Sequence, residues 1–440
     1  MQQLLGIVAL SHKAAAAVMS DSDAPRTLLR HDWQDDGAAV AGLTDWAAQA
    51  ALNPSSPEFV LAKQATADLI RAVTVHDSDE GSLDHQTFKR SLDGVKANPL
   101  IAQALSKLIA ANLSDFGADE PSQVTGPGDE NHLRISTDQR HRFAMLASTD
   151  QDARILLRLA ADAYKTSVLS DPTSTEAKSA GFVDAMVTAA GHNAVYYDHI
   201  NDADAVNKAR AAAQADEQMV KSVATYLFGE IADGIKVPGK VTGMSADVGR
   251  WVLGRVIDEG LMQIPEPATV LPTTVDTDAD ATGVGVAENH AAHDLANARV
   301  RTGDTTGLNP QLLERGSDGR PHLKGLSAMT TDERRLLQTW ARTKTGGGDY
   351  IETYANAFRG YYGLGEKIED GPDGLRNFVE APTRRPATDD DTAGSQQSWR
   401  WWSWRPADVT GSKTCHLRHR PHRPRHLPPY QRPSSHQTSA

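Results

Sequence analysis

Two histidines three residues apart, His290 and His293, form the pattern in this sequence that comes nearest to a reactive site. On a helix this spacing puts both imidazoles on one face, as ligands of one metal ion require, and Asp294 adds a carboxylate beside them. Such a set would predict a metal-dependent hydrolase. The HExxH order of zinc enzymes is absent, however, and the sequence places no further ligand. We therefore expect a solvated polar helix here, with no metal and no cofactor.

A second acidic pattern resembles the start of a calcium-binding loop. Asp276, Asp278 and Asp280 match the first three ligand positions of an EF-hand, but Ala281 replaces the glycine of the turn and Ala287 replaces the bidentate glutamate. Residues 1–382 contain neither a nucleophile elbow nor a phosphate-binding loop with its lysine. The sequence therefore predicts that the protein is not an enzyme.

The composition changes abruptly near Thr383. The whole chain carries a net charge of −12, whereas residues 383–440 carry +6, so the preceding body carries −18. An acidic body repels nucleic acid and anionic membranes and favours basic partners. We therefore expect protein partners and no nucleic acid.

The tail, residues 383–440, is rich in Trp, Arg, His and Pro and is predicted to be disordered. Three interpretations are open. The first, which the composition favours, is a segment translated in a shifted frame of G+C-rich DNA. The second is a natural disordered tail. The third is nucleic-acid binding through its arginines and tryptophans.

The single cysteine, Cys415, excludes an internal disulfide framework and a cysteine-based metal cluster. The first 19 residues lack a basic start, and His12 and Lys13 interrupt their apolar run, so we expect an ordinary amphipathic helix and no signal peptide. No transmembrane segment is predicted. The protein is then cytoplasmic, or exported without a classical signal peptide, and its oligomeric state stays open.

The spacing of the apolar residues is helical almost throughout, which predicts an all-α fold, a multi-helix bundle or array. Asp36 is expected to cap a helix that runs to about residue 52. Asn98 followed by Pro99 predicts a helix boundary. A long helical stretch beyond Thr173 is expected to turn back at residues 201–204.

We expect two helical bodies. The main domain covers residues 1–267, an acidic linker or long loop covers 268–286, and a smaller helical unit covers 287–382. One helix of the smaller unit carries an aromatic face at helical spacing, which predicts core packing rather than a binding site. The face consists of Tyr350, Tyr354, Phe358 and Tyr361.

A Trp-x-Asp-Asp-Gly turn that leads into an alanine-rich helix is unusual as a unit; here it is Trp33, Asp35, Asp36 and Gly37. With this turn, residues 4–364 resemble the actinobacterial TPR repeat region-containing proteins. The resemblance implies a long helical protein associated with type VII (ESX) secretion, acting through interactions or as an exported protein. It implies a structural role for the four motif residues and transfers no catalytic residue.

The chain departs from that family in two ways. It contains no 34-residue repeat of the tetratricopeptide pattern, so a peptide-binding groove is not expected. Members of the family usually begin with further helical sequence similar to small WXG-type secretion partners, whereas this chain starts almost directly at Ser11-His12 and contains no Trp-x-Gly, which suggests a truncated or split reading frame. Its one match to a type VII export signal, Tyr362 with Glu366, contains glycines that disfavour the required helix. The sequence thus predicts a non-enzymatic helical interaction protein, and the alternative is a metal-dependent hydrolase using His290 and His293.

Overall fold

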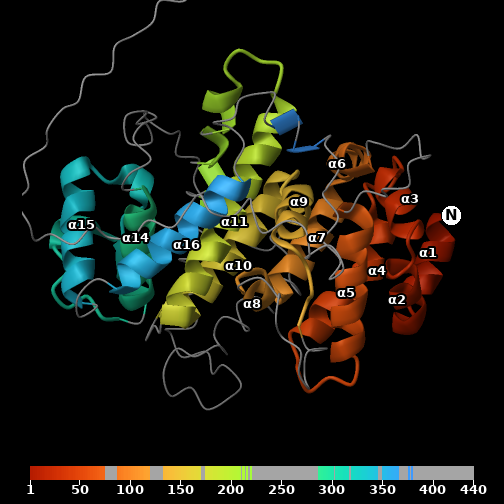
Figure 1. Cartoon of the computed structure of the whole chain (residues 1–440), viewed down its shortest axis with the longest axis horizontal. Coiled ribbons are helices and arrows are strands. Elements are labelled where there is room, and N and C mark those ends of the chain that lie inside the picture. Colours follow the sequence, from red (N-terminus) through yellow and green to blue (C-terminus); the bar gives the residue numbers. More distant parts are fainter. Residues whose placement is uncertain are drawn as a thin grey trace, which may run out of the picture. The chain divides into compact units, whose positions relative to one another are not determined.

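A computed structural model describes residues 1–74, 87–118, 132–169, 174–209, 211–213, 215–216, 219–220, 286–301, 303–316, 319–344, 349–365, 375–376 and 378–379. Helices dominate these residues, which confirms the predicted all-α class (Figure 1). The helices of the first half are α1 Gln2–Ala9, α2 His12–Met19, α3 Ala24–Arg30, α4 Ala38–Ala51, α5 Phe59–Thr74, α6 Thr87–Ala97, α7 Pro99–Ala111 and α8 Leu113–Phe116. The later helices are α9 Thr137–Ala147, α10 Gln151–Leu169, α11 Ser174–Asp198, α14 Val286–Arg301, α15 Thr331–Lys344 and α16 Asp349–Gly365.

The chain divides into two units, Met1–Arg384 and Arg385–Ala440. This boundary lies two residues from the composition change at Thr383. The whole of the second unit lies outside the described residues, and so do its tryptophans and arginines. The three interpretations of the tail therefore stay predictions.

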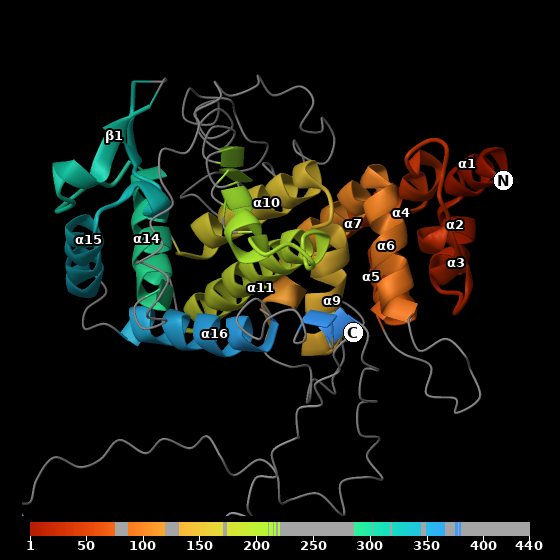
Figure 2. The ribbon, with the colours of Figure 1, turned by 90° about the horizontal axis from the view of Figure 1, so that it is seen from above.

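Helix α4 lies at the centre of the first half. Helices α1, α2, α5 and α7 all pack against it (Figures 1 and 2). Alanine side chains on α4, among them Ala47 and Ala48, are fully buried and let the neighbouring helices approach closely. Buried apolar residues from Leu5 to Val379 form one continuous core. Within the part of the chain that the structure describes, no helix combines the length and the apolar character needed to cross a bilayer.

The opening segment differs from the single amphipathic helix that we expected. Ser11 adopts an extended conformation and caps α2 by accepting a hydrogen bond from the Ala14 amide, so the segment forms two helices, α1 and α2. Leu5 packs inward from α1, whereas Leu4 and Ile7 on its other side are exposed. Helix α1 is therefore apolar on both its inner and its outer face.

The cap of α4 is Asp35, and the expectation that Asp36 would serve was wrong by one residue. The Asp35 carboxylate accepts hydrogen bonds from the amides of Gly37 and Ala39, at 3.2 and 3.3 Å. Asp36 and Gly37 both have positive φ, +54° and +86°. This left-handed pair turns the chain so that the Asp35 side chain, three residues before the first residue of the helix, reaches the free amides at the helix start.

Trp33 is buried and joins this turn to the start of α7. Its amide donates to the Asn98 side chain at 3.0 Å, and its indole N–H donates to the Leu28 carbonyl at 2.9 Å. Asn98 is also fully buried, and its side-chain amide donates to the carbonyls of His31 and Gly94. The Trp33–Gly37 turn thus has a structural role, because hydrogen bonds of Asn98 connect it to the boundary between α6 and α7. That boundary falls at Asn98-Pro99, as predicted.

Local signals position the helices of the second half. The Ser136 hydroxyl and the Gln139 side chain form a reciprocal capping box at the start of α9. Asp150 caps α10, because its carboxylate accepts a hydrogen bond from the Ala153 amide at 3.1 Å. After α11 the chain turns over residues 199–204 and helical residues resume at 205, so the predicted turn in the long helical stretch is present.

Helix α16 packs along α11, although some 150 residues separate them in the sequence (Figure 2). The helices meet at Gly181, where a Cβ atom would lie 2.5 Å from the Tyr354 carbonyl oxygen. The aromatic face of α16 is buried in this contact, as predicted. We expected residues 287–382 to form a separate unit, but α14 and α16 pack directly on α10 and α11. The proposed linker, residues 268–286, lies almost wholly outside the described residues.

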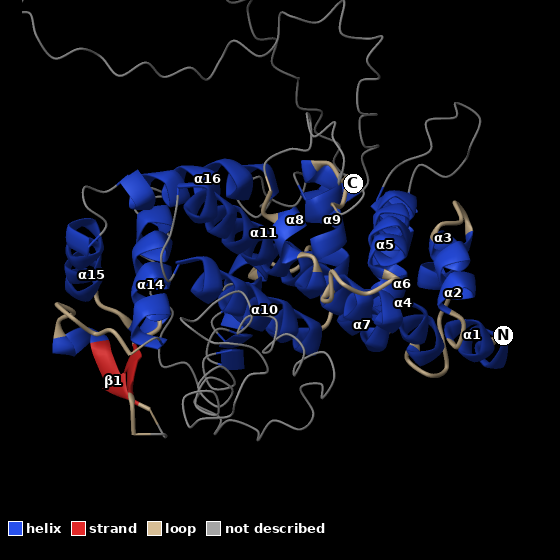
Figure 3. Cartoon of the chain, turned by 90° about the horizontal axis from the view of Figure 1, so that it is seen from below, coloured by secondary structure: helices blue, strands red, loops and turns tan. Residues whose placement is uncertain are grey.

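A two-stranded antiparallel hairpin, β1 Leu313–Arg315 and β2 Pro321–Leu323, lies between α14 and α15 in the sequence (Figure 3). Leu313 pairs with Leu323, and short 3₁₀ turns flank the strands at Pro310–Leu312 and Leu326–Ala328. Strands of three residues show too little alternation to be recognised in a sequence.

Candidate functional site

His290 and His293 lie on a helix, α14, as expected, but this helix is largely buried, so the expectation of a solvated polar helix was wrong. The two histidines contact different elements. His290 Nδ1 lies 2.7 Å from Asp184 Oδ2 of α11. His293 Nε2 lies 3.1 Å from the backbone carbonyl oxygen of Lys324, just after β2. Each imidazole thus has a partner within the protein.

Asp294 lies within a buried ionic cluster. Lys165 Nζ of α10 lies 2.8 Å from Asp184 Oδ1 and 2.7 Å from Asp294 Oδ2. The Tyr354 hydroxyl of α16 is 3.0 Å from Asp184 Oδ2 and also contacts Asp294 Oδ2. We call Lys165, Asp184, His290, Asp294 and Tyr354 the junction cluster, because they join α10, α11, α14 and α16.

The junction cluster is largely closed to solvent. The side chains of Lys165, Asp184 and Asp294 are at most 10% exposed, and Tyr354 is fully buried. The His290 side chain is 26% exposed, so it is the member that water reaches most easily. The Phe358 ring lies against the His290 imidazole, with ring centroids 4.8 Å apart.

The protonation states follow from this packing. Burial alone would lower the pKa of the Lys165 ammonium, but the carboxylates of Asp184 and Asp294 outweigh it and raise this pKa. Burial would raise the pKa of Asp184, but Lys165 and His290 outweigh burial and hold this pKa well below its ordinary value. Burial and the two carboxylates raise the pKa of Tyr354.

These shifts decide what the cluster can do chemically. A lysine that stays protonated is neither a nucleophile nor a general base, and a carboxylate in a closed ion pair has no substrate within reach. The arrangement is therefore that of a polar contact between helices. Buried ion pairs of this kind cost desolvation, and removal of one partner leaves an uncompensated charge in the core.

The described residues do not provide a set of ligands for a metal ion. Among them, no three His, Cys, Asp or Glu side chains lie where they could hold one. His290 and His293 are engaged with Asp184 and the Lys324 carbonyl instead. The calcium-like aspartates at 276–280 lie outside the described residues, as does Glu366 of the export-signal match.

Sequence reasoning did not single out Lys165, Asp184 or Tyr354 as members of a cluster. A signal was present, because Lys165 and Asp184 interrupt otherwise apolar helix faces. A charged residue at a core position needs an opposite charge nearby. The sequence alone does not say which of the many charged residues that partner is.

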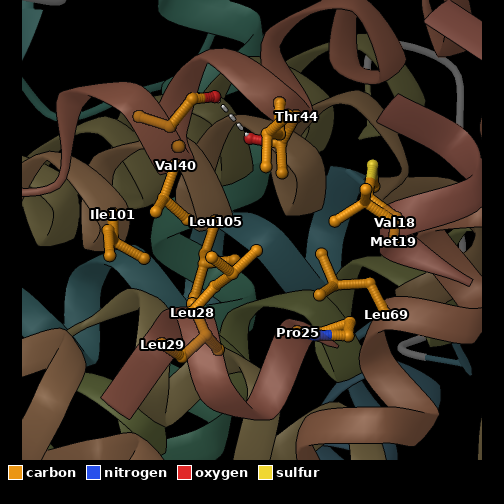
Figure 4. Close-up of a pocket in the computed structure, with 13 residues that line it drawn as sticks. Val18, Met19, Pro25, Leu28, Leu29, Val40, Thr44, Leu69, Ile101 and Leu105 are labelled. Atoms are coloured by element: carbon orange, nitrogen blue, oxygen red, sulfur yellow. Dashed lines mark hydrogen bonds between the residues drawn. The ribbon is translucent and has the colours of Figure 1, made fainter. Parts of the chain in front are cut away.

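A small apolar cavity lies in the first half of the chain (Figure 4). Its lining comes from α2, α3, α4, α5 and α7, including Met19, Leu29, Val40, Leu69 and Leu105. The space free to a water-sized sphere is about 20 Å³, which is the size of a single water and far below that of a ligand pocket. We interpret it as a packing void.

Comparison with models of protein families, with curated proteins and with solved structures finds no match. The resemblance to TPR repeat region-containing proteins therefore stays a prediction.

Proposed function

We propose that this protein is a non-enzymatic helical interaction protein that binds a partner through the outer face of α1. The observation that supports this most strongly is the concentration of exposed apolar side chains there. Met1, Leu4, Ile7 and Leu10 are 65–86% exposed. Among the described residues, only two other large hydrophobic side chains, Val60 and Leu336, are exposed.

The outer face of α1 also lacks charge. Residues 1–11 contain no acidic or basic side chain, although charged residues make up 23% of the whole chain. A helix that is apolar on both sides is normally buried on both sides, and here Leu5 packs inward while Leu4 and Ile7 face solvent. Exposed apolar patches of this kind are typical of interaction sites.

The chemistry of the face suggests the kind of partner. Leu4, Ile7 and Leu10 recur every three residues, a spacing that fits the apolar stripe of another amphipathic helix. The acidic body, with its net charge of −18, would attract a partner whose apolar stripe is flanked by lysine or arginine. The association with type VII secretion rests on the family resemblance alone.

The experiment compares two double variants of the full chain, expressed with a tag in the native host. Leu4→Glu/Ile7→Glu puts two charges on the apolar face. Gln3→Glu/Gly6→Glu puts two charges at exposed positions of the same helix but leaves the apolar side chains in place. Proteins that co-purify are quantified by mass spectrometry, and circular dichroism checks that both variants fold.

We expect a helical partner that the wild type and the control retain and that the apolar-face variant loses at least about tenfold, a difference of ~1.4 kcal/mol in binding. If every co-purifying protein is retained equally by both variants, α1 is not the interaction surface. Metal analysis of the same preparations addresses the alternative. Stoichiometric zinc that a His290→Ala variant loses would favour the metal-dependent hydrolase over the interaction protein.

A further inference from the structure

The junction cluster lies where two parts of the chain that are distant in sequence meet. Asp184 and His290 are 106 residues apart, and most of the chain between them lies outside the described residues. Helices α14 and α16 reach α10 and α11 through apolar packing and a small set of polar contacts. Besides the cluster, Arg301 of α14 contacts Asp162 and Thr166 of α10.

The charges of the cluster do not balance without His290. Two carboxylates, Asp184 and Asp294, face one lysine, which leaves a net charge of −1 in a buried site. A protonated His290 neutralises it, whereas a neutral imidazole does not. The Tyr354 hydroxyl has a single hydrogen, so it donates to one of the two carboxylates at a time.

The other charges nearby are already paired. On α10, Asp162 pairs with Arg301, and at the other edge Glu288 of α14 pairs with Arg359 of α16. Tyr350 of α16 is a titratable neighbour of Asp294, and burial and this carboxylate raise the pKa of Tyr350, so it keeps its proton near neutral pH. His293 is another such neighbour, with Nδ1 3.7 Å from Asp294 Oδ1. Its Nε2 has the Lys324 carbonyl as a partner, and it does not contact Asp184.

We propose that the junction cluster is a pH-sensitive lock, which holds α14 and α16 on α10 and α11 while His290 is protonated and weakens when His290 loses its proton. Three groups face His290: Lys165 from α10, Asp184 from α11 and Asp294 from its own helix. From α16, Tyr354 shares Asp184 Oδ2 with it, and the uncharged Phe358 ring covers its face.

The direction of the pH dependence follows from the pKa of His290. Burial alone would lower this pKa, but the Asp184 and Asp294 carboxylates outweigh burial and raise it above 6.5. A raised pKa means that the stabilisation is fully present below the pKa of the unfolded chain and is lost as the pH rises through the folded value. Each unit of elevation corresponds to about a tenfold change in the opening equilibrium.

The two aspartates of the cluster give the opposite pH dependence, because their stabilisation is lost at low pH. The pKa values of Asp184 and Asp294 are lowered, because Lys165 and its neighbours outweigh the effect of burial, so their contribution disappears only when the pH falls through these low values. Lys165 and Tyr354 have raised pKa values and keep their protons near neutral pH. Within the cluster, His290 is thus the group whose ordinary pKa lies closest to neutral pH, and the neighbouring carboxylates raise that pKa.

Hydrogen exchange of the full chain, measured by mass spectrometry at about pH 6 and pH 9 and corrected for the intrinsic rate, tests the lock. In the wild type we expect peptides of α14 and α16 to lose protection at the higher pH, by about tenfold per unit of pKa elevation. His290→Gln should show the low protection at both pH values. His293→Gln is the matched control and should keep the pH dependence.

A second variant tests the charge balance even if His290→Gln does not fold. Asp294→Asn removes one carboxylate, so Lys165 and Asp184 balance without a protonated histidine, and protection should persist at about pH 9. Two other histidines lie beside residues of α16: His141 is next to Tyr361 and His192 is next to Tyr362. The variants leave both of these histidines unchanged. Protection in the wild type that is equal at both pH values, or a pH dependence that Asp294→Asn leaves intact, would overturn the proposal.

Discussion

At Gly37 the backbone φ of +86° and the space around the residue both require glycine. A Cβ atom would lie 2.3 Å from Ile101 Cγ1 and 3.1 Å from Asn98 Cβ. We expect Gly37→Ala to lower the free energy of unfolding by about 1–3 kcal/mol, because the substitution adds a clash to a left-handed conformation. Urea denaturation followed by circular dichroism measures the change.

Gly42 provides the control for this prediction. It lies inside α4, where a Cβ atom would meet only Ala9 Cβ, at 3.8 Å. Gly42→Ala should leave stability unchanged or raise it by up to about 1 kcal/mol, because alanine is the better helix former. Equal losses in the two variants would show that the turn at Gly37 does not have the geometry described.

At the scale of elements, the packing of α2, α3, α4, α5 and α7 leaves a void that is already present in the wild type. Leu105 of α7 lines this void and is 1% exposed. We expect Leu105→Ala to destabilise the protein by about 2–5 kcal/mol, because the enlarged cavity adds to the lost burial. Thermal and urea unfolding of the full chain measure the loss.

Leu336 of α15 is the matched position on the surface. It is 39% exposed, so Leu336→Ala should change the free energy of unfolding by no more than about 0.5 kcal/mol. If Leu105→Ala were equally mild, the helices around the void would not be packed as described.

For the whole molecule, the described core lies within the unit Met1–Arg384. We expect a chain that ends at Arg384 to have the same midpoint of thermal unfolding as the full chain, to within about 2 °C. Circular dichroism of the two proteins in one buffer makes the comparison. A midpoint lower by more than about 5 °C would show that residues 385–440 contribute to the stability of the first unit.

The sequence by itself determined the helical class and most helix positions, because apolar periodicity and caps act over three or four residues. The aromatic stripe of Tyr354 and Phe358 was correctly assigned to the core for this reason. Local signals were less accurate where a left-handed backbone intervened: the cap of α4 is Asp35, since Asp36 takes up positive φ.

Only the tertiary structure decided which charges meet. Lys165 and Asp184 are visible in the sequence as charges on apolar faces, but their partners on α14 are more than 100 residues away. It also decided that α14 and α16 pack on α10 and α11, where composition suggested a separate unit, and that the outer face of α1 stays exposed. Contacts between distant segments depend on the shape and charge of whole helix surfaces, and these contacts leave no period in a single sequence.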